Sequence, residues 1–236
     1  MFPSRFPGAL APAALAVGLM TAGVSASAAS LTEGFDVVVP AGWTATNKSS
    51  PVGTSSWFQG NVAVFTAQAG ATNSYAGANF NSTAGAGTIS NWLISPTLSF
   101  NNGDVVSFFT RTVDSPAFPD SLELRFSNVG GTNVGTLATD TGDFSLLLSV
   151  NPALTTTGYP NTWTQFTSTI TGLTGPTNGA IAFRYFVTDG GPSGNNSDYI
   201  GVDSLAITAV PEPASYLLMA LGVGGLLLRR SRAARA

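Results

Sequence analysis

Apolar and polar residues alternate along much of the central part of this 236-residue chain, and the pattern restricts that part to β-structure. Leu122, Leu124 and Phe126 alternate with Glu123 and Arg125. Because successive side chains of a strand point to opposite faces of its sheet, this spacing predicts a strand with one buried face. Residues 106–108 and 181–187 alternate in the same way, and turn-forming residues separate such segments throughout.

The same signals predict further strands at residues 35–39, 62–66, 75–80, 89–94, 144–150, 163–170 and 200–208. Small polar and glycine-rich segments predict exposed loops at residues 67–74, 84–87 and 189–198. No segment of the central region has the pattern of a long amphipathic helix. Many short strands separated by turns favour an all-β jelly-roll β-sandwich over a barrel of long hairpins.

The composition excludes several classes of function. Residues 29–209 carry four basic and eleven acidic side chains, a formal net charge of −7, which argues against nucleic acid as a partner. The chain has no cysteine and no histidine, so disulfides, Ser-His-Asp and Cys-His catalysis and histidine-ligated zinc are excluded. About 180 residues suffice for one sandwich domain with a sizeable core.

The N-terminal residues have the three parts of a secretory signal peptide. Arg5 supplies the positive region, residues 9–24 are apolar, and Ala26-Ser27-Ala28 provides a small-residue cleavage site. Residues 1–28 are therefore predicted to be removed on export, which leaves residues 29–209 as the β-sandwich domain.

The C-terminal residues 210–236 also have three parts. The segment Val210-Pro211-Glu212-Pro213 is followed by an uncharged apolar segment, residues 214–228, and then by Arg229, Arg230, Arg232 and Arg235. The two prolines favour an extended backbone around Glu212, which suits recognition by a protease. This order of parts resembles the PEP-CTERM sorting tail of Gram-negative bacteria. The resemblance implies an exosortase as processing partner, which cuts near the Pro-Glu-Pro motif.

The apolar segment is short for a transmembrane helix. Its 15 residues span roughly 22 Å as a helix, against about 30 Å of hydrocarbon core. Arginine side chains that reach toward the lipid headgroups can extend it, and by the positive-inside rule they keep this end in the cytoplasm. The alternative is a buried or amphipathic terminal helix. Residues 214–228 have no polar face at helical spacing, which disfavours this alternative. We expect a single span in the inner membrane before processing, with the domain outside, and then release to the cell surface or matrix.

A second resemblance covers nearly all of residues 31–208. It is carried by motifs spread in order over the domain: Glu33-Gly34-Phe35-Asp36, Pro40-Ala41-Gly42-Trp43, Ser56-Trp57-Phe58-Gln59-Gly60, Ser90-Asn91-Trp92-Leu93-Ile94-Ser95-Pro96 and the segment 183–203. These resemble the choice-of-anchor J domain, which is similar to cleaved-adhesin and MAM-like jelly rolls. The resemblance implies an extracellular role in adhesion or binding and no catalytic residues.

Aromatic residues have two interpretations. Trp43, Trp57, Trp92 and Trp163 can each anchor the core of a sandwich that lacks disulfides. Alternatively, an exposed aromatic ring stacks on a sugar while neighbouring polar groups bind its hydroxyls. Trp57, Gln59 and Tyr159 are the candidates for such glycan contacts because polar turn residues surround them.

The last predicted strand contains a change of register. Ile200 and Val202 share one face by their spacing, but Leu205 and Ile207 share the other, so we expect a β-bulge between the pairs. The bulge would redirect Asp203, which with Glu33 of the first strand is a candidate pair for a structural Ca²⁺, completed by backbone carbonyls. The alternative is a surface Asp and a capping Glu.

A second, weaker group of oxygen donors lies in the loop at residues 189–198. Asp189, Asn195, Asn196 and Asp198 could contribute to a metal site or form an ordinary solvated turn. The sequence does not decide between the two interpretations.

Two functions from different classes remain. The first is a non-enzymatic surface or matrix protein that binds extracellular polysaccharide or a cell surface. The second is a glycoside hydrolase or lyase that uses two carboxylates, for which Glu123 with Asp120 or Asp114 are the candidates.

Overall fold

The computed structural model describes residues 30–210 together with residues 221–222. The predicted signal peptide, the motif residues Pro211, Glu212 and Pro213, nearly all of the apolar segment and the four C-terminal arginines lie outside the described residues. Among the residues that are described, no helix has the length and hydropathy needed to cross a bilayer.

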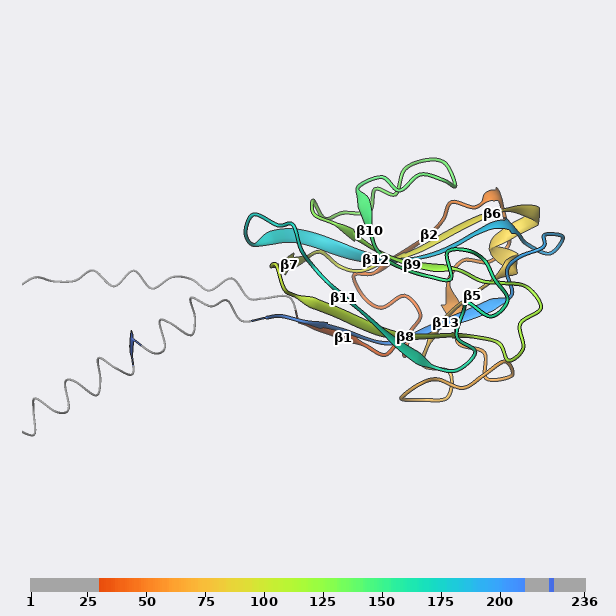
Figure 1. Cartoon of the computed structure of the whole chain (residues 1–236), viewed down its shortest axis with the longest axis horizontal. Helices are drawn as coiled ribbons and strands as arrows, with labels where there is room; N and C mark the ends of the chain where they lie inside the picture. Colours follow the sequence, from red (N-terminus) through yellow and green to blue (C-terminus); the bar gives the residue numbers. More distant parts are fainter. Residues whose placement is uncertain (1–29, 211–220, 223–236) are drawn as a thin grey trace, which may run out of the picture.

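Two antiparallel sheets pack face to face (Figure 1). The first sheet has the order β11 (Thr164–Thr169), β8 (Val105–Thr112), β13 (Tyr199–Thr208), β5 (Ala76–Asn79) and β4 (Phe58–Gln59), with β1 (Leu31–Glu33) also paired to β13. The second has the order β10 (Phe144–Val150), β9 (Leu122–Ser127), β12 (Thr177–Gly190), β6 (Thr83–Ile94) and β2 (Thr44–Asn47), with β3 (Ser50–Val52) paired to β6 and β7 (Leu98–Phe100) to β12. A short 3-10 helix, η1 (Phe80–Ser82), follows β5. The prediction of an all-β sandwich is confirmed.

The core lies between the two sheets, where the alternating residues were expected. Leu122, Leu124 and Phe126 of β9 are buried. Phe108 of β8 meets Phe183 of β12 across the sandwich, with ring centroids 4.9 Å apart in an edge-to-face arrangement. The two-residue period therefore identified the interior faces of both sheets.

Three local predictions are wrong. Residues 35–39 form no strand, because the chain turns at Phe35, whose φ is 51° and whose backbone N–H donates to the Glu33 carboxylate. Residues 62–66 form a turn that brings Phe65 against Tyr75 on the outer face of the first sheet. Residues 84–87 belong to β6 and not to a loop, because β3 pairs beside them.

The predicted bulge is confirmed. The register between β13 and β8 shifts between Asp203 and Ala206, and Ser204 adopts a positive φ of 49°. Ile200, Val202, Leu205 and Ile207 are all buried as a result. The extra residue thus returns the apolar side chains of β13 to the core after the change of parity.

Strand β13 gives the sandwich two distinct ends. Leu31 pairs with Ile207, so the described chain enters and leaves at the end where β13 finishes. The loop between β12 and β13 lies at the other end, where β13 begins (Figure 1). Ten residues at about 3.3 Å each separate the two ends by roughly 30 Å.

Candidate functional site

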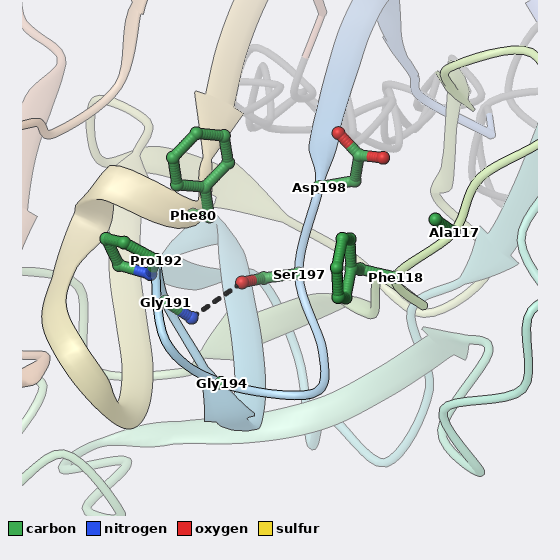
Figure 2. Close-up of a pocket in the computed structure, with 8 residues that line it drawn as sticks. All are labelled: Phe80, Ala117, Phe118, Gly191, Pro192, Gly194, Ser197 and Asp198. Carbon is green, nitrogen blue, oxygen red and sulfur yellow. Dashed lines mark hydrogen bonds between the residues drawn. The ribbon is translucent and has the colours of Figure 1, made fainter.

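A pocket of about 200 Å³ opens at the end of the sandwich where β13 begins. Three chain segments meet there: Phe80, the first residue of η1, Ala117 and Phe118 in the connection from β8 to β9, and the loop from β12 to β13. The loop contributes Gly191, Pro192, Gly194, Ser197 and Asp198. Figure 2 shows Phe80 and Phe118 standing apart on either side of Ser197, with Asp198 on the same side of the pocket as Phe118.

Backbone hydrogen bonds join the three segments. The N–H of Phe80 donates to the carbonyl of Asp198 at 3.1 Å, and the N–H of Ser197 donates to the carbonyl of Pro119 at 2.9 Å. The loop is closed on itself by the N–H of Gly191, which donates to Ser197 Oγ at 2.8 Å (Figure 2). The walls are therefore fixed relative to one another by peptide groups, and the pocket is formed in advance of any ligand.

A fully buried carboxylate lies beneath the pocket. Asp120 Oδ1 accepts hydrogen bonds from the Tyr185 hydroxyl at 2.5 Å and from the backbone N–H of Asp198 at 2.8 Å, and Oδ2 accepts from Thr112 Oγ1 at 2.7 Å. Burial away from water raises the pKa of Asp120 to about 6, although these donors act in the opposite direction. Asp120 thus supports the start of β13 from inside the protein.

Thr112 has two acceptors within reach, and a neutral Asp120 carboxyl would allow both of them to be satisfied. Thr112 Oγ1 lies 2.7 Å from Asp120 Oδ2 and 2.9 Å from the carbonyl of Tyr199, but a hydroxyl has one proton to donate. If Asp120 is protonated, it donates to Thr112, and Thr112 donates to Tyr199. The geometry therefore agrees with the raised pKa.

The lining of the pocket is mostly apolar and carries one ionisable group. Phe118 is 45% exposed and is the one aromatic ring among the exposed large apolar side chains of residues 30–210. Asp198 is the only ionisable residue among the eight, and partial burial raises its pKa. Two aromatic rings, a proline and one carboxylate form a surface that can bind a ring with an apolar face and a polar or charged edge.

Hydrolysis by a carboxylate pair has no support in this geometry. Glu123 Oε2 lies 2.7 Å from Arg125 and 3.1 Å from Arg184 in a mostly buried ion cluster. Asp114 is exposed and pairs with Arg111, and Asp120 is fully buried. These candidates do not face one another across a cleft, as two catalytic carboxylates must.

The predicted glycan contacts do not offer open ring faces. Trp57 is 5% exposed and Tyr159 is 3% exposed, with the Tyr159 hydroxyl 2.6 Å from Thr110 Oγ1. Gln59 donates to the carbonyls of Phe35 and Asn73 and accepts from the N–H of Val38. Polar neighbours in the sequence suggested exposure, but these side chains hold the fold together. Three of the four tryptophans, Trp43, Trp57 and Trp92, are buried as core anchors.

Asp203 and Glu33 lie on neighbouring strands. Glu33 pairs with Leu205, two residues beyond Asp203. Asp203 Oδ2 accepts from the N–H groups of Gln68 and Ala69, and Oδ1 accepts from Ser204. These three N–H groups satisfy the buried carboxylate, and within residues 30–210 no three His, Cys, Asp or Glu side chains gather as a metal site. Burial raises the pKa of Asp203.

The loop at residues 189–198 is held by side-chain hydrogen bonds of the kind found in an ordinary turn. Asn195 Nδ2 donates to Asp189 Oδ2 at 2.7 Å, and Asn196 donates to the carbonyl of Thr188, so these residues build the turn. Asp198 faces the pocket instead. Phe80 and Phe118 were missed because a Phe beside a turn carries no sequence signal that distinguishes an exposed ring from a core ring.

Comparisons with known proteins agree with this division into a domain and a tail. Residues 209–232 match the PEP-CTERM protein-sorting motif. This motif implies export and sorting to the cell surface by an exosortase. No match was found among the curated proteins compared.

Solved structures resemble the sandwich. The K1 cleaved adhesin domain of Lys-gingipain from Porphyromonas gingivalis W83 is similar over 78% of this chain and 99% of its own, with 24% identity and a TM-score of 0.54. The K3 domain covers 76% of this chain and 97% of its own, with 21% identity and a TM-score of 0.50. The K2 domain covers 77% of this chain and 99% of its own, with 19% identity and a TM-score of 0.51. At these identities the likeness shows a shared fold.

Proposed function

We propose that this protein is an exported surface or matrix protein whose β-sandwich binds extracellular polysaccharide, or a cell surface that displays it, without catalysis. The observation that carries the proposal is the preformed aromatic pocket at the end of the sandwich farthest from the sorting tail. The domain is of the choice-of-anchor J type, with jelly-roll connectivity.

The route to the surface follows from the two ends of the sequence. The signal peptide, residues 1–28, starts export, and residues 214–228 hold the precursor in the inner membrane with Arg229, Arg230, Arg232 and Arg235 on the cytoplasmic side. The exosortase then cuts near Val210-Pro211-Glu212-Pro213. Mass spectrometry of the surface-released protein tests this step. The expected product lacks residues 1–28 and most of the tail, whereas an unprocessed tail on the released protein would contradict it.

Binding is tested with the full chain in mild detergent and exopolysaccharide from the producing cells. Phe118→Ala removes an exposed ring of the pocket, and Leu146→Ala, which removes an exposed apolar side chain of β10 outside the pocket, is the matched control. We expect Phe118→Ala to weaken binding at least tenfold and Leu146→Ala to leave it unchanged. No binding by the unaltered protein, or equal binding by both variants, would overturn the proposal.

Calcium at Glu33 and Asp203 stays a prediction. Its support is the pairing of β1 with β13 beside the bulge, which puts the two carboxylates on adjacent strands, where backbone carbonyls could complete the ligands. A bound ion would stabilise the folded state, so the thermal midpoint should fall after chelation and recover with added Ca²⁺. An unchanged midpoint removes the ion from the account.

A further inference from the structure

We propose that the pocket between Phe80 and Phe118 takes one positively charged amino-sugar residue of a polysaccharide, whose ammonium group pairs with the Asp198 carboxylate. The inference rests on the proposed function and names the class of sugar. It follows from the size of the pocket, its aromatic walls and the charge around it.

The size and walls of the pocket suit a single sugar ring. Sites for drug-sized ligands measure roughly 300–1,000 Å³, whereas this pocket measures about 200 Å³. The C–H face of a pyranose ring packs on an aromatic ring, and both Phe80 and Phe118 border the space. A phenylalanine that is 45% exposed has apolar area left for such a contact.

The same loop gives a polymer room to continue. Ser115 and Pro116 precede Ala117 and Phe118 and border a second pocket of about 400 Å³, together with Thr156, Thr157, Tyr159, Pro160 and Asn161. The two pockets therefore adjoin one surface loop. A chain of sugars can place one residue beside Phe118 and extend over the second pocket.

The charges in and around the pocket favour a positively charged ligand over an anionic one. Asp198 is the only charged lining residue, and the ion pairs within residues 30–210 use Asp114 and Glu123 but not Asp198. None of the eight lining residues is basic. Arg111 is paired with Asp114, and Arg125 and Arg184 are paired with Glu123. With a net charge of −7 on residues 29–209, the domain repels polyanions and attracts cations at long range.

An ammonium group would be attracted both by the Asp198 carboxylate and by the aromatic rings of the pocket. A carboxylate that is partly removed from water, as the raised pKa of Asp198 indicates, interacts more strongly with a nearby cation than a fully solvated one does. Aromatic faces add a cation–π attraction of about 0.5–1 kcal/mol at exposed sites. A neutral sugar receives the stacking contact and ordinary hydrogen bonds only.

Three tetrasaccharides that differ only at carbon 2 test the inference. The β-1,4-linked tetramers of glucose, N-acetylglucosamine and glucosamine carry a hydroxyl, an acetamide and an ammonium group there. Calorimetry with the full chain in mild detergent, at about pH 6 and low salt, keeps ordinary carboxyl groups ionised and amines charged. We expect the glucosamine tetramer to bind about tenfold more tightly than the other two, which corresponds to about 1.4 kcal/mol.

Variants separate the charge from the rings. Asp198→Asn should remove the preference and leave glucose-tetramer binding unchanged, whereas Asp143→Asn, the same change on an exposed loop, should keep it. Phe118→Ala should weaken all three ligands. Equal affinity for the three tetramers overturns the amino-sugar inference and leaves polysaccharide binding in place. If neither these tetramers nor the exopolysaccharide binds, both proposals fail.

Discussion

The two ends of strand β13 are held in the same way but by different chemistry. Two fully buried aspartates, one before and one after β8 in the sequence, each accept a backbone N–H from one end of β13. Asp120 accepts the N–H of Asp198 at 2.8 Å, and Asp104 accepts the N–H of Val210 at 3.1 Å. The second oxygen of Asp104 accepts the N–H of Asn101 at 2.8 Å. Within residues 30–210, Asp104 therefore bonds to peptide groups only, whereas Asp120 is also hydrogen-bonded to the hydroxyls of Thr112 and Tyr185.

The difference separates anchoring from recognition. At the Asp104 end, two peptide hydrogen bonds fix the point at which the sorting motif leaves the domain. At the Asp120 end, the network connects β8, β12 and the start of β13 beneath the pocket, so it positions Asp198 and, through the carbonyl of Asp198, Phe80. The Asp104 end fixes where the chain leaves the domain, and the Asp120 end supports the residues that line the pocket.

The largest expected effect is the loss of Asp120. Asp120→Ala removes the acceptor of the Tyr185 hydroxyl and of the Asp198 N–H, and it removes a hydrogen-bond partner of Thr112. We therefore expect the free energy of unfolding to fall by about 2–4 kcal/mol. Urea denaturation of the full chain in mild detergent measures this change. A loss below that of the matching change at Asp104 would contradict the view that Asp120 joins more of the structure.

Asp104→Ala should cost less, about 1–2 kcal/mol, because it removes the acceptor of two peptide N–H groups. It should also make the backbone around Val210 easier to cleave by an added protease, while polysaccharide binding stays unchanged. Weaker polysaccharide binding by this variant would show that the two ends of β13 are coupled, so that anchoring and recognition are not separate.

Asp120→Asn should stabilise the protein at neutral pH by about 1 kcal/mol. The amide mimics the neutral acid, since it can donate to Thr112 and still accept from Tyr185. Because the folded-state pKa of Asp120 is raised to about 6, its contribution to stability is full below the ordinary carboxyl pKa and is lost as the pH rises through about 6.

The difference between Asp120→Asn and the unaltered protein should therefore shrink as the pH falls from about 7.5 to about 4. Thermal midpoints measured side by side across this range give the comparison. A constant difference would mean that Asp120 does not titrate in this window.

The sequence predicted the sheets better than the site, for physical reasons. The apolar residues of β13 change from one face of the strand to the other between Val202 and Leu205. A β-bulge corrects such a change, and the structure has one there. Leu122 and Phe183 occupy interior faces because alternation leaves no other arrangement for apolar residues. Local patterns carry this information directly.

Exposure of single aromatics depends on loops, whose paths are set by distant contacts. Tyr159 lies beside turn residues, yet its hydroxyl bonds to Thr110 on β8 and its ring is buried. Phe118 becomes exposed because the connection from β8 to β9 is bonded at Pro119 to Ser197, far along the chain. Such contacts leave no trace in the neighbouring sequence. The tail is the opposite case, since its motif is contiguous and matched directly.

Phe118→Ala has the smallest expected effect on stability, and its binding gives the most direct test of function. Phe118→Ala should change the free energy of unfolding by less than about 0.5 kcal/mol, as for other exposed positions. Its binding isotherm with exopolysaccharide, beside that of Leu146→Ala, tests whether the end opposite the tail is the recognition surface. We expect at least a tenfold loss of affinity for Phe118→Ala and none for Leu146→Ala. Unchanged affinity of a stably folded Phe118→Ala protein would show that this end of the sandwich is not the recognition surface.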